Sequence, residues 1–263
     1  MTVSLWADVL DQSPDPEVVK SADFRDRMVE TELPWRVRDQ RTGIEMLLVP
    51  PGKFEMGASI GDEVAGENEK PMHSVTLKKA FYLGRSLVNQ SEWVKIVGDL
   101  GMIRVDNPTH ALWAWAGAFQ RFCKVSQLRL PTEAEWEYAC RGGDARPRYG
   151  DLDQIAWCGS LDRYETHPLR DKLPNALGFY DMIGNGWQLC ADWYGERYYR
   201  RCKNGVKDPK GPKLPKETHN LQGVARGGLW FAGSEICRAS YRRRLDLNDV
   251  KRSTTCARVA RDP

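Results

Sequence analysis

The sequence lacks several patterns that mark common classes of protein. It has no CxxC pair, no basic start followed by an apolar run within residues 1–12, and nothing near the roughly 18 apolar residues of a membrane span. It also lacks a GxxxxGK[ST] loop and a GxGxxG motif between a strand and a helix, so no common phosphate-binding loop is present. These absences predict a cytoplasmic protein without a signal peptide or a membrane partner.

Strong charge of either sign is also missing. Lys and Arg total 39 against 36 Asp and Glu, a net charge of +3, and the two signs are interspersed. The basic runs at 242–244 and 203–216 have acidic residues within or beside them, among them Asp208, Glu217 and Asp246. We therefore interpret both runs as solvated mixed-charge surface and expect no nucleic-acid partner.

Histidine is scarce, and cysteine occurs in an odd number. The four histidines are widely spaced and form no HxH or HxxxH pair, so each is expected to be a lone surface or hydrogen-bonded residue: His73, His110, His167 and His219. The seven cysteines, with no secretion signal, are expected to be free thiols: Cys123, Cys140, Cys158, Cys190, Cys202, Cys237 and Cys256.

Tryptophan and glycine, by contrast, are abundant. Ten Trp and 23 Gly in 263 residues are typical of a chain with much irregular structure held by aromatic packing. The length allows one large domain or two small ones. We expect a main domain over residues 34–263, preceded by an extension over 1–33.

The extension is predicted to be helical. Trp6, Val9 and Leu10 have helical spacing, and after a break at 13–16 a second helix is expected from Pro16 to Met28. It could serve as a docking arm for a partner, but we favour a helical extension that lies on the domain.

From Pro34 onward the pattern changes to short strands and a few helices. Short runs that alternate between apolar and polar residues or are apolar throughout predict strands at 35–39, 44–49, 54–57, 73–77 and 81–83. Helices are expected after the cap residue Asn89 through Ile96, over 111–123, and over 132–140, where Thr132 and Glu135 have the spacing of a capping box.

The chain is organised around its C-terminal segment, residues 226–261. It opens with Gly227 and Gly228, which suit a sharp bend or a close backbone approach. Strands are predicted at 237–242 and 256–260, joined by a polar, charged run, and together they read as a hairpin that closes a domain. The residues between the strands suit a recognition surface better than a core.

Four ordered motifs carry a family resemblance: LLVPPGKFEMG (47–57), LRLPTEAEWEYACRGG (128–143), LGFYDMIGNGWQLCADWYG (177–195), and ARGGLWF with CRASYRRR and CARVAR (225–261). The chain resembles the formylglycine-generating-enzyme, or sulfatase-modifying-factor, domain over residues 34–261. The resemblance implies an α+β, C-type-lectin-like fold with little regular structure, a small antiparallel sheet and two to three helices.

The resemblance also implies two copper-binding cysteines, at positions that fall on Ala232 and Cys237. Because Ala232 has no thiol, the linear two-sulfur site that suits Cu(I) is incomplete, so we expect no copper and no oxidase activity. Cys256 could be argued as a substitute ligand, but a packed thiol is the preferred interpretation for Cys237 and Cys256. A related branch uses three histidines for iron, which the histidine spacing here does not support.

The resemblance further implies a structural calcium ion, for which matching ligands are present in this sequence. The matching ligands are the side chains of Asp181 and Gln188 and the carbonyls of Gly184 and Gly186. Calcium takes such oxygen ligands from irregular backbone. The alternative is a turn held by the side chains of Asp181 and Asn185 without an ion.

The position of the C-terminal segment resembles that of variable proteins of diversity-generating retroelements, which are non-catalytic members of this fold. We therefore predict a ligand-binding, receptor-type protein, and the Trp and Arg residues suggest a protein ligand. The candidate ligand-binding residues are Trp230, Phe231, Ser234, Glu235, Ser240, Arg243, Arg244, Asp246 and Asn248.

The same segment should also contain buried scaffold residues. These are Arg226, Gly227, Gly228, Cys237, Arg238, Ala239, Arg258 and Val259, whereas the candidate ligand-binding residues other than Ser240 should be largely exposed on one face. Two alternatives stay open: an oxidase of the formylglycine-generating or iron sulfoxide synthase type with unusual ligands, and an intracellular regulatory or scaffold domain docked through residues 1–33.

Overall fold

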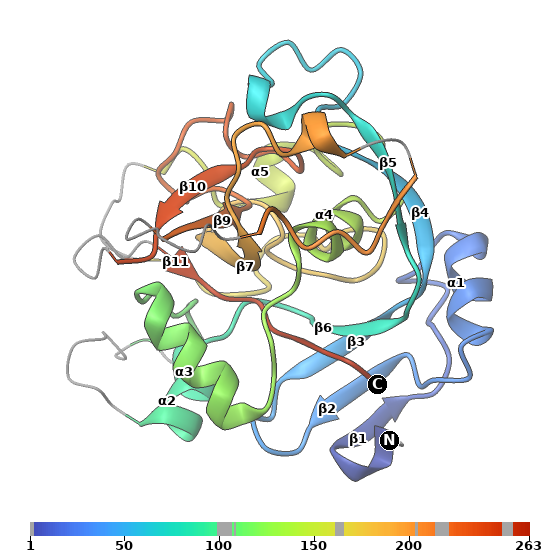
Figure 1. Ribbon diagram of the computed structural model, residues 1–263. Helices are drawn as coiled ribbons and strands as arrows, with labels where there is room; N and C mark the ends of the chain where they lie inside the picture. Colours follow the sequence, from blue (N-terminus) through green and yellow to red (C-terminus); the bar gives the residue numbers. More distant parts are fainter. Residues whose placement is uncertain are drawn as a thin grey trace.

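The computed structural model describes residues 3–98, 107, 109–160, 166–202, 205–213, 221–248 and 255–263. These residues form an α+β fold in which short strands and helices alternate with long irregular stretches (Figure 1). The expected fold class is confirmed.

The largest sheet has five antiparallel strands in the order β1-β2-β3-β6-β12. They are β1 (Ala7–Asp11), β2 (Arg36–Asp39), β3 (Glu45–Val49), β6 (Phe81–Gly84) and β12 (Ala260–Arg261). The helix predicted around Trp6 to Leu10 is wrong, because these residues pair with β2 as an edge strand. The strands predicted at 35–39, 44–49 and 81–83 are confirmed to within a residue.

Two smaller sheets complete the β-structure. One has the order β10-β9-β7-β11, from β10 (Arg243–Asp246), β9 (Gln222–Arg226), β7 (Trp187–Trp193) and β11 (Thr255–Cys256). The other has the order β4-β5-β8, from β4 (Gly52–Met56), β5 (His73–Leu77) and β8 (Val206–Lys207). The strands predicted at 54–57 and 73–77 are therefore confirmed.

The hairpin predicted for the C-terminal segment is not formed. Residues 237–242 are irregular, and β10 pairs with β9 rather than with a later strand. The last two strands join separate sheets, since β11 runs parallel to β7 whereas β12 pairs with β6. The segment thus connects two sheets instead of folding back on itself.

The helices are short, and two of them begin at the capping boxes that the sequence predicts. They are α1 (Ala22–Val29), α2 (Gln90–Val97), α3 (Ala116–Ser126), α4 (Glu133–Arg141) and α5 (Leu152–Ile155), with 3-10 turns at Val3–Leu5, Glu67–Glu69 and Tyr199–Arg201. Asn89 and Glu92 cap α2, and Thr132 and Glu135 cap α4. Helices α1 and α3 both start later than expected, after Ser21 and Trp115.

Helix α4 lies near the middle of the molecule and packs against β4, β5 and β7 (Figure 1). The main hydrophobic core surrounds it and also includes Trp6, Val19, Phe24 and Met28 from the first 33 residues. The extension is therefore built into the core of the domain. All seven cysteines are free, as predicted. Within the described ranges, no helix has the length and apolar character needed to cross a bilayer.

Candidate functional site

The C-terminal segment enters the site through a glycine turn that only glycine can form. Gly227 and Gly228 have φ angles of 95° and 99°. A Cβ on Gly227 would lie 2.8 Å from the Met182 carbonyl oxygen, and one on Gly228 would lie 2.8 Å from the Cys237 Sγ. Both the backbone conformation and the close packing therefore require glycine, as the sequence predicted.

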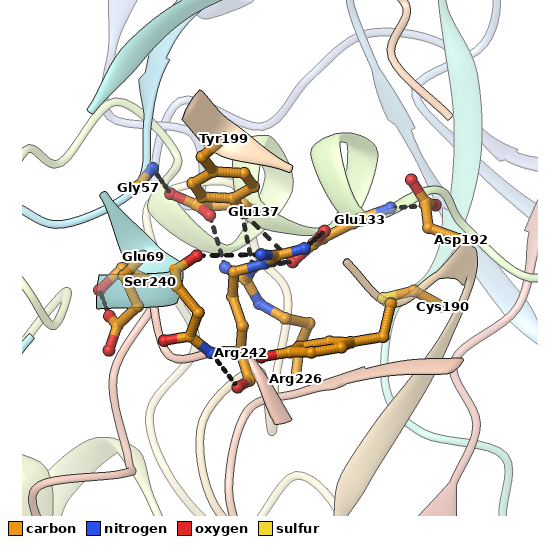
Figure 2. A network of polar contacts seen from close by, with 12 residues as sticks. Gly57, Glu69, Glu133, Glu137, Cys190, Asp192, Tyr199, Arg226, Ser240 and Arg242 are labelled. Carbon is orange, nitrogen blue, oxygen red and sulfur yellow. Dashed lines mark hydrogen bonds and ion pairs between the residues drawn. The ribbon is translucent and has the colours of Figure 1, made fainter. Parts of the chain in front are cut away.

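Arg226, just before this turn, is fully buried among carboxylates of helix α4 (Figure 2). Its Nη1 lies 2.6 Å from Glu133 Oε1, and its Nη2 lies 2.5 Å from Glu137 Oε2. A buried charge needs such partners, because an unpaired one costs several kcal/mol. Arg226 thereby fixes strand β9 to helix α4.

Arg242, from the middle of the segment, binds the same carboxylate (Figure 2). Its Nε and Nη2 donate to the two oxygens of Glu133, at 2.6 and 2.8 Å. Burial alone would raise the pKa of Glu133, but Arg242 and Arg226 together outweigh burial and lower that pKa to about 2. Glu133 therefore stays ionised and holds both arginines.

Arg238 forms a second buried anchor, to the loop that follows β4. Its guanidinium binds both carboxylate oxygens of Glu69 at 2.8 Å and Asp62 at 2.6 Å. The Ser240 hydroxyl donates to Glu69 at 2.7 Å, and Ser240 is fully buried. Its assignment to the ligand-binding surface is therefore wrong, because its hydroxyl is used inside the scaffold.

Trp230 is also buried, although the sequence interpretation placed it on the surface. It contacts Trp113 and Phe231 edge-to-face, with centroid distances of 5.9 and 5.0 Å. With Trp187 it forms a small aromatic core separate from the main one. The error arises because Trp113 and Trp187 lie far from Trp230 in the sequence.

The remaining candidates lie in the turn after Trp230 and on or just after strand β10. Ser234, Glu235, Arg244, Asp246 and Asn248 are exposed, and Phe231 and Arg243 are half-buried. Phe231, Tyr241 and Leu245 all pack on the aromatic core, which brings the turn after Trp230 and strand β10 to the same part of the surface. We call these seven candidates, Phe231, Ser234, Glu235, Arg243, Arg244, Asp246 and Asn248, the segment surface.

The expected scaffold residues, by contrast, are all buried. Those confirmed are Arg226, Gly227, Gly228, Cys237, Arg238, Ala239, Arg258 and Val259. The basic run 242–244 is split by this arrangement. Arg242 is inside, Arg243 lies over the Trp187 ring at 4.9 Å, and only Arg244 is exposed, so the run is not one solvated patch. In the other basic run, residues 203–204 and 214–216 lie outside the described residues.

The predicted calcium loop is held by protein groups. The Gln188 side-chain oxygen accepts hydrogen bonds from Trp136 Nε1 and Arg258 Nε, both at 2.9 Å, and its Nε2 donates to the carbonyls of Asp181 and Met182. A calcium ligand set that includes Gln188 requires this amide to leave Trp136 and Arg258. Such a site does not fit the present arrangement.

The side chains of Asp181 and Asn185 bind the backbone of residues 167–170 and so hold the loop to a neighbouring stretch rather than to its own turn. Asp181 Oδ2 accepts a hydrogen bond from the backbone N–H of Arg170 at 2.9 Å. Asn185 Oδ1 accepts from the backbone N–H of His167 at 2.9 Å, and Asn185 Nδ2 donates to the His167 carbonyl at 3.1 Å. Burial raises the pKa of Asp181. Calcium binding by Asp181, Gly184, Gly186 and Gln188 stays a prediction.

The position implied for the first copper ligand carries only the methyl group of Ala232, so the two implied positions do not fit a two-thiolate site. The sequence interpretation missed Cys158, whose Sγ donates to the Ala232 carbonyl at 3.1 Å and hydrogen-bonds the Cys237 thiol. No local motif points to this contact, because the two cysteines are far apart in the chain. Among the residues that the structure describes, no three His, Cys, Asp or Glu side chains form a metal-binding group, and His219 is outside them.

Several known proteins are similar to this chain. It is 28% identical over 264 residues to the serine/threonine-protein kinase Pkn1 of Chlamydia trachomatis, covering 90% of this chain but 41% of that protein. It is 25% identical to the formylglycine-generating enzyme of Streptomyces coelicolor, covering 73% of this chain and 79% of that enzyme. The chain thus spans about two fifths of the Chlamydia kinase.

Solved structures show the same fold. PvdO from Pseudomonas aeruginosa superposes with a TM-score of 0.72 at 24% identity, over 87% of this chain and 98% of that one. Treponema denticola variable protein 1 superposes with a TM-score of 0.64 at 21% identity, over 84% and 95%. The profile of the sulfatase-modifying factor enzyme 1-like domain matches residues 34–263, nine tenths of the sequence, and the chain belongs to this family.

Proposed function

We propose that this protein is a non-catalytic receptor that binds a protein ligand through the segment surface. One observation carries the proposal. Within a single stretch of chain, every expected scaffold residue is buried, while five polar or charged residues are exposed to solvent. Loops and edge strands supported by a rigid scaffold are where proteins commonly place recognition residues.

The chemistry of the surface suits a protein ligand. Phe231 and Tyr241 are half-buried aromatic side chains, and Arg243 and Arg244 follow on β10, with Arg243 over the Trp187 ring. Aromatic and arginine side chains are enriched among residues that dominate the energy of protein–protein contacts. Ser234, Glu235, Asp246 and Asn248 would supply the polar rim.

The likeness in fold to Treponema denticola variable protein 1 supports a variable-protein role. If the segment surface is diversified by a retroelement, the flanking DNA should contain a reverse transcriptase gene and a near-copy of the sequence encoding residues 226–261. In that copy, codon differences should fall on the segment surface and spare Arg226, Gly228 and Arg238. A copy that differs mainly at scaffold codons would contradict diversification.

The binding test compares two variants in one crosslinking experiment. In the surface variant, Ser234, Glu235, Arg244, Asp246 and Asn248 are changed to alanine. In the matched control, the exposed Lys53 and Glu55 of β4 are changed to alanine instead. A ligand protein recovered with the wild type should bind the control equally and bind the surface variant at least tenfold more weakly. Equal binding to all three proteins would place the ligand site elsewhere.

The enzymatic alternative needs its own assay. The Ala232 methyl group at an implied copper position supports an inactive protein. We expect no oxidation of a cysteine in a sulfatase-type peptide when the purified protein is supplied with Cu(I) and oxygen. Turnover with stoichiometric copper would instead establish an oxidase.

A regulatory module is the second candidate, because the similarity to the Chlamydia kinase covers only part of that larger protein. Here the same surface would recruit a partner for a separate catalytic part. Binding through exposed residues of the extension, such as Leu5 and Val29, rather than through the segment surface would favour this role.

A further inference from the structure

Two thiols from distant parts of the chain meet beneath the segment surface. Cys237 is fully buried behind Gly228, and Cys158 is half-buried in the stretch that follows α5. Cys158 Sγ donates to the carbonyl oxygen of Ala232 at 3.1 Å, and the two thiols hydrogen-bond each other.

Backbone hydrogen bonds hold this contact in place. The N–H of Gly159 donates to the Ala232 carbonyl at 2.9 Å, and the N–H of Ser160 donates to the Trp230 carbonyl at 2.8 Å. Residues 158–160 are thereby fixed along residues 230–232. The position of Cys158 beside residues 230–232 thus follows from backbone contacts and not from one side-chain rotamer alone.

The two thiols differ in their environment. The hydrogen bond from Cys237 lowers the pKa of Cys158 against the effect of burial, and the Arg148 guanidinium lowers it further, while Glu235 and Asp153 oppose this. The same hydrogen bond, together with burial, raises the pKa of Cys237. Arg148 is held nearby, because its Nε donates to the Cys237 carbonyl at 2.8 Å. Cys158 is thus the thiolate-prone, solvent-reachable member of the pair.

The other thiols lack this combination. Burial raises the pKa of Cys123, Cys140, Cys190, Cys202 and Cys256. Cys158 is therefore the one cysteine of the seven that combines partial exposure with a lowered pKa and a second thiol in contact.

We propose that Cys158 and Cys237 form a peroxide-sensitive dithiol site. The Cys158 thiolate attacks one oxygen of hydrogen peroxide, which becomes a sulfenic acid on sulfur and releases hydroxide. The Cys237 thiol then attacks the Cys158 sulfur, so that a disulfide forms and the sulfenic oxygen leaves as water. Two thiols lose two electrons, and one peroxide is reduced to two waters. A dithiol reductant reverses the reaction.

The disulfide would join residues 157–160 to the turn that carries Phe231, Ser234 and Glu235. If the segment surface binds a ligand as proposed above, oxidation changes the mobility of that turn and hence ligand affinity. The dithiol chemistry itself does not depend on the ligand-binding role.

The test uses the full chain, reduced and kept in a chelator so that trace metal plays no part. After treatment with hydrogen peroxide, free thiols are alkylated under denaturing conditions and the peptides are mapped by mass spectrometry. We expect a Cys158–Cys237 disulfide with the other thiols alkylated. Seven alkylated cysteines, or a disulfide between any other pair, would overturn the proposal.

Two single variants separate the roles of the sulfurs. Cys158→Ser should leave every remaining thiol reduced at the same peroxide dose, whereas the control Cys123→Ser should still form the disulfide. Cys237→Ala should trap Cys158 as a sulfenic acid that reacts with dimedone. If Cys237→Ala does not fold, the comparison of the wild type with Cys158→Ser decides alone. Disulfide formation at Cys237 without Cys158 would contradict the assignment.

Discussion

Glu133 is the carboxylate that two buried arginines of the C-terminal segment share. We expect Glu133→Gln to lower the free energy of unfolding by about 3–5 kcal/mol, because it leaves Arg242 buried without a counter-charge and Arg226 paired with Glu137 alone. Urea unfolding at pH 7 measures this. The control Glu235→Gln changes an exposed carboxylate in the same segment and should cost less than about 0.5 kcal/mol.

The pH dependence of the stability difference between wild type and Glu133→Gln tests whether the charge of Glu133 causes that difference. The pKa of Glu133 is about 2 in the fold, below its ordinary value of 4.5. Its contribution to stability is therefore present above pH 4.5 and is lost as the pH falls from 4.5 toward 2. The difference between wild type and Glu133→Gln should shrink between pH 5 and pH 3. A constant difference would point to packing rather than charge.

Asp192 has the opposite pH behaviour. Burial and the neighbouring Glu133 raise the pKa of Asp192 to about 8, so the folded protein holds it neutral. The contribution of the neutral Asp192 carboxyl to the stability of the fold is therefore complete below pH 4 and is lost as the pH rises toward 8. Asp192→Asn, whose amide oxygen can still accept the Glu133 N–H, should become more stable relative to wild type across that range. The exposed Asp246→Asn should show no such trend, and an Asp192→Asn protein less stable than wild type at pH 8 would contradict the assignment.

At the scale of single elements, the glycine turn before Trp230 allows the energetic cost of backbone strain to be distinguished from the cost of steric crowding. Gly228 and Gly61 both have positive φ angles, 99° and 77°, but a Cβ on Gly61 would meet nothing within 4 Å. Gly228→Ala should therefore lower the unfolding free energy by about 1–3 kcal/mol more than Gly61→Ala, because the Cys237 sulfur must move. Thermal melting of both variants beside the surface variant provides the comparison. Equal effects of the two glycine changes would remove the crowding explanation.

The sequence correctly predicted those helices and strands that are determined by residues within or next to them. The capping boxes at Thr132 and Asn89 begin helices α4 and α2 as expected, and five short strands were placed from their apolar or alternating patterns. The burial of Arg226 and Arg238 and the need for glycine at 227–228 followed from the recognised motifs.

Elements decided by distant partners could not be predicted in this way. Trp6, Val9 and Leu10 have helical spacing, yet pairing with β2 makes this stretch a strand. Trp230 is buried because Trp113 and Trp187 pack around it. Ser240 is buried because its hydroxyl donates a hydrogen bond to Glu69. The contact of Cys158 with Cys237 has the same origin, since tertiary structure alone brings the two thiols together.

For the whole molecule, the first 33 residues behave as part of the domain. Trp6, Val19, Phe24 and Met28 lie in the main core, and β1 extends the largest sheet. Deleting residues 1–33 should lower the melting temperature by more than roughly 10 °C or prevent folding, because several large core side chains are lost together. Circular dichroism of the truncated protein measures this.

A control distinguishes that structural role from a docking role. Leu5 and Val29 are 70% and 60% exposed, so changing both to serine should leave the melting temperature nearly unchanged. If the truncated protein had the same melting temperature as the wild type, the extension would be dispensable for the fold, as a docking arm would be.

The way in which the last strands connect two sheets also affects how the protein is made. Until residues 255–261 have left the ribosome, β7 and β6 lack their partners β11 and β12, and Arg258 has not reached its buried position between Gln188 and the Gly84 carbonyl. Open strand edges are templates for unwanted association. Translation that stalls before Thr255 should therefore yield nascent chains that depend on chaperones, whereas chains whose residues 255–261 have left the ribosome can close both sheets.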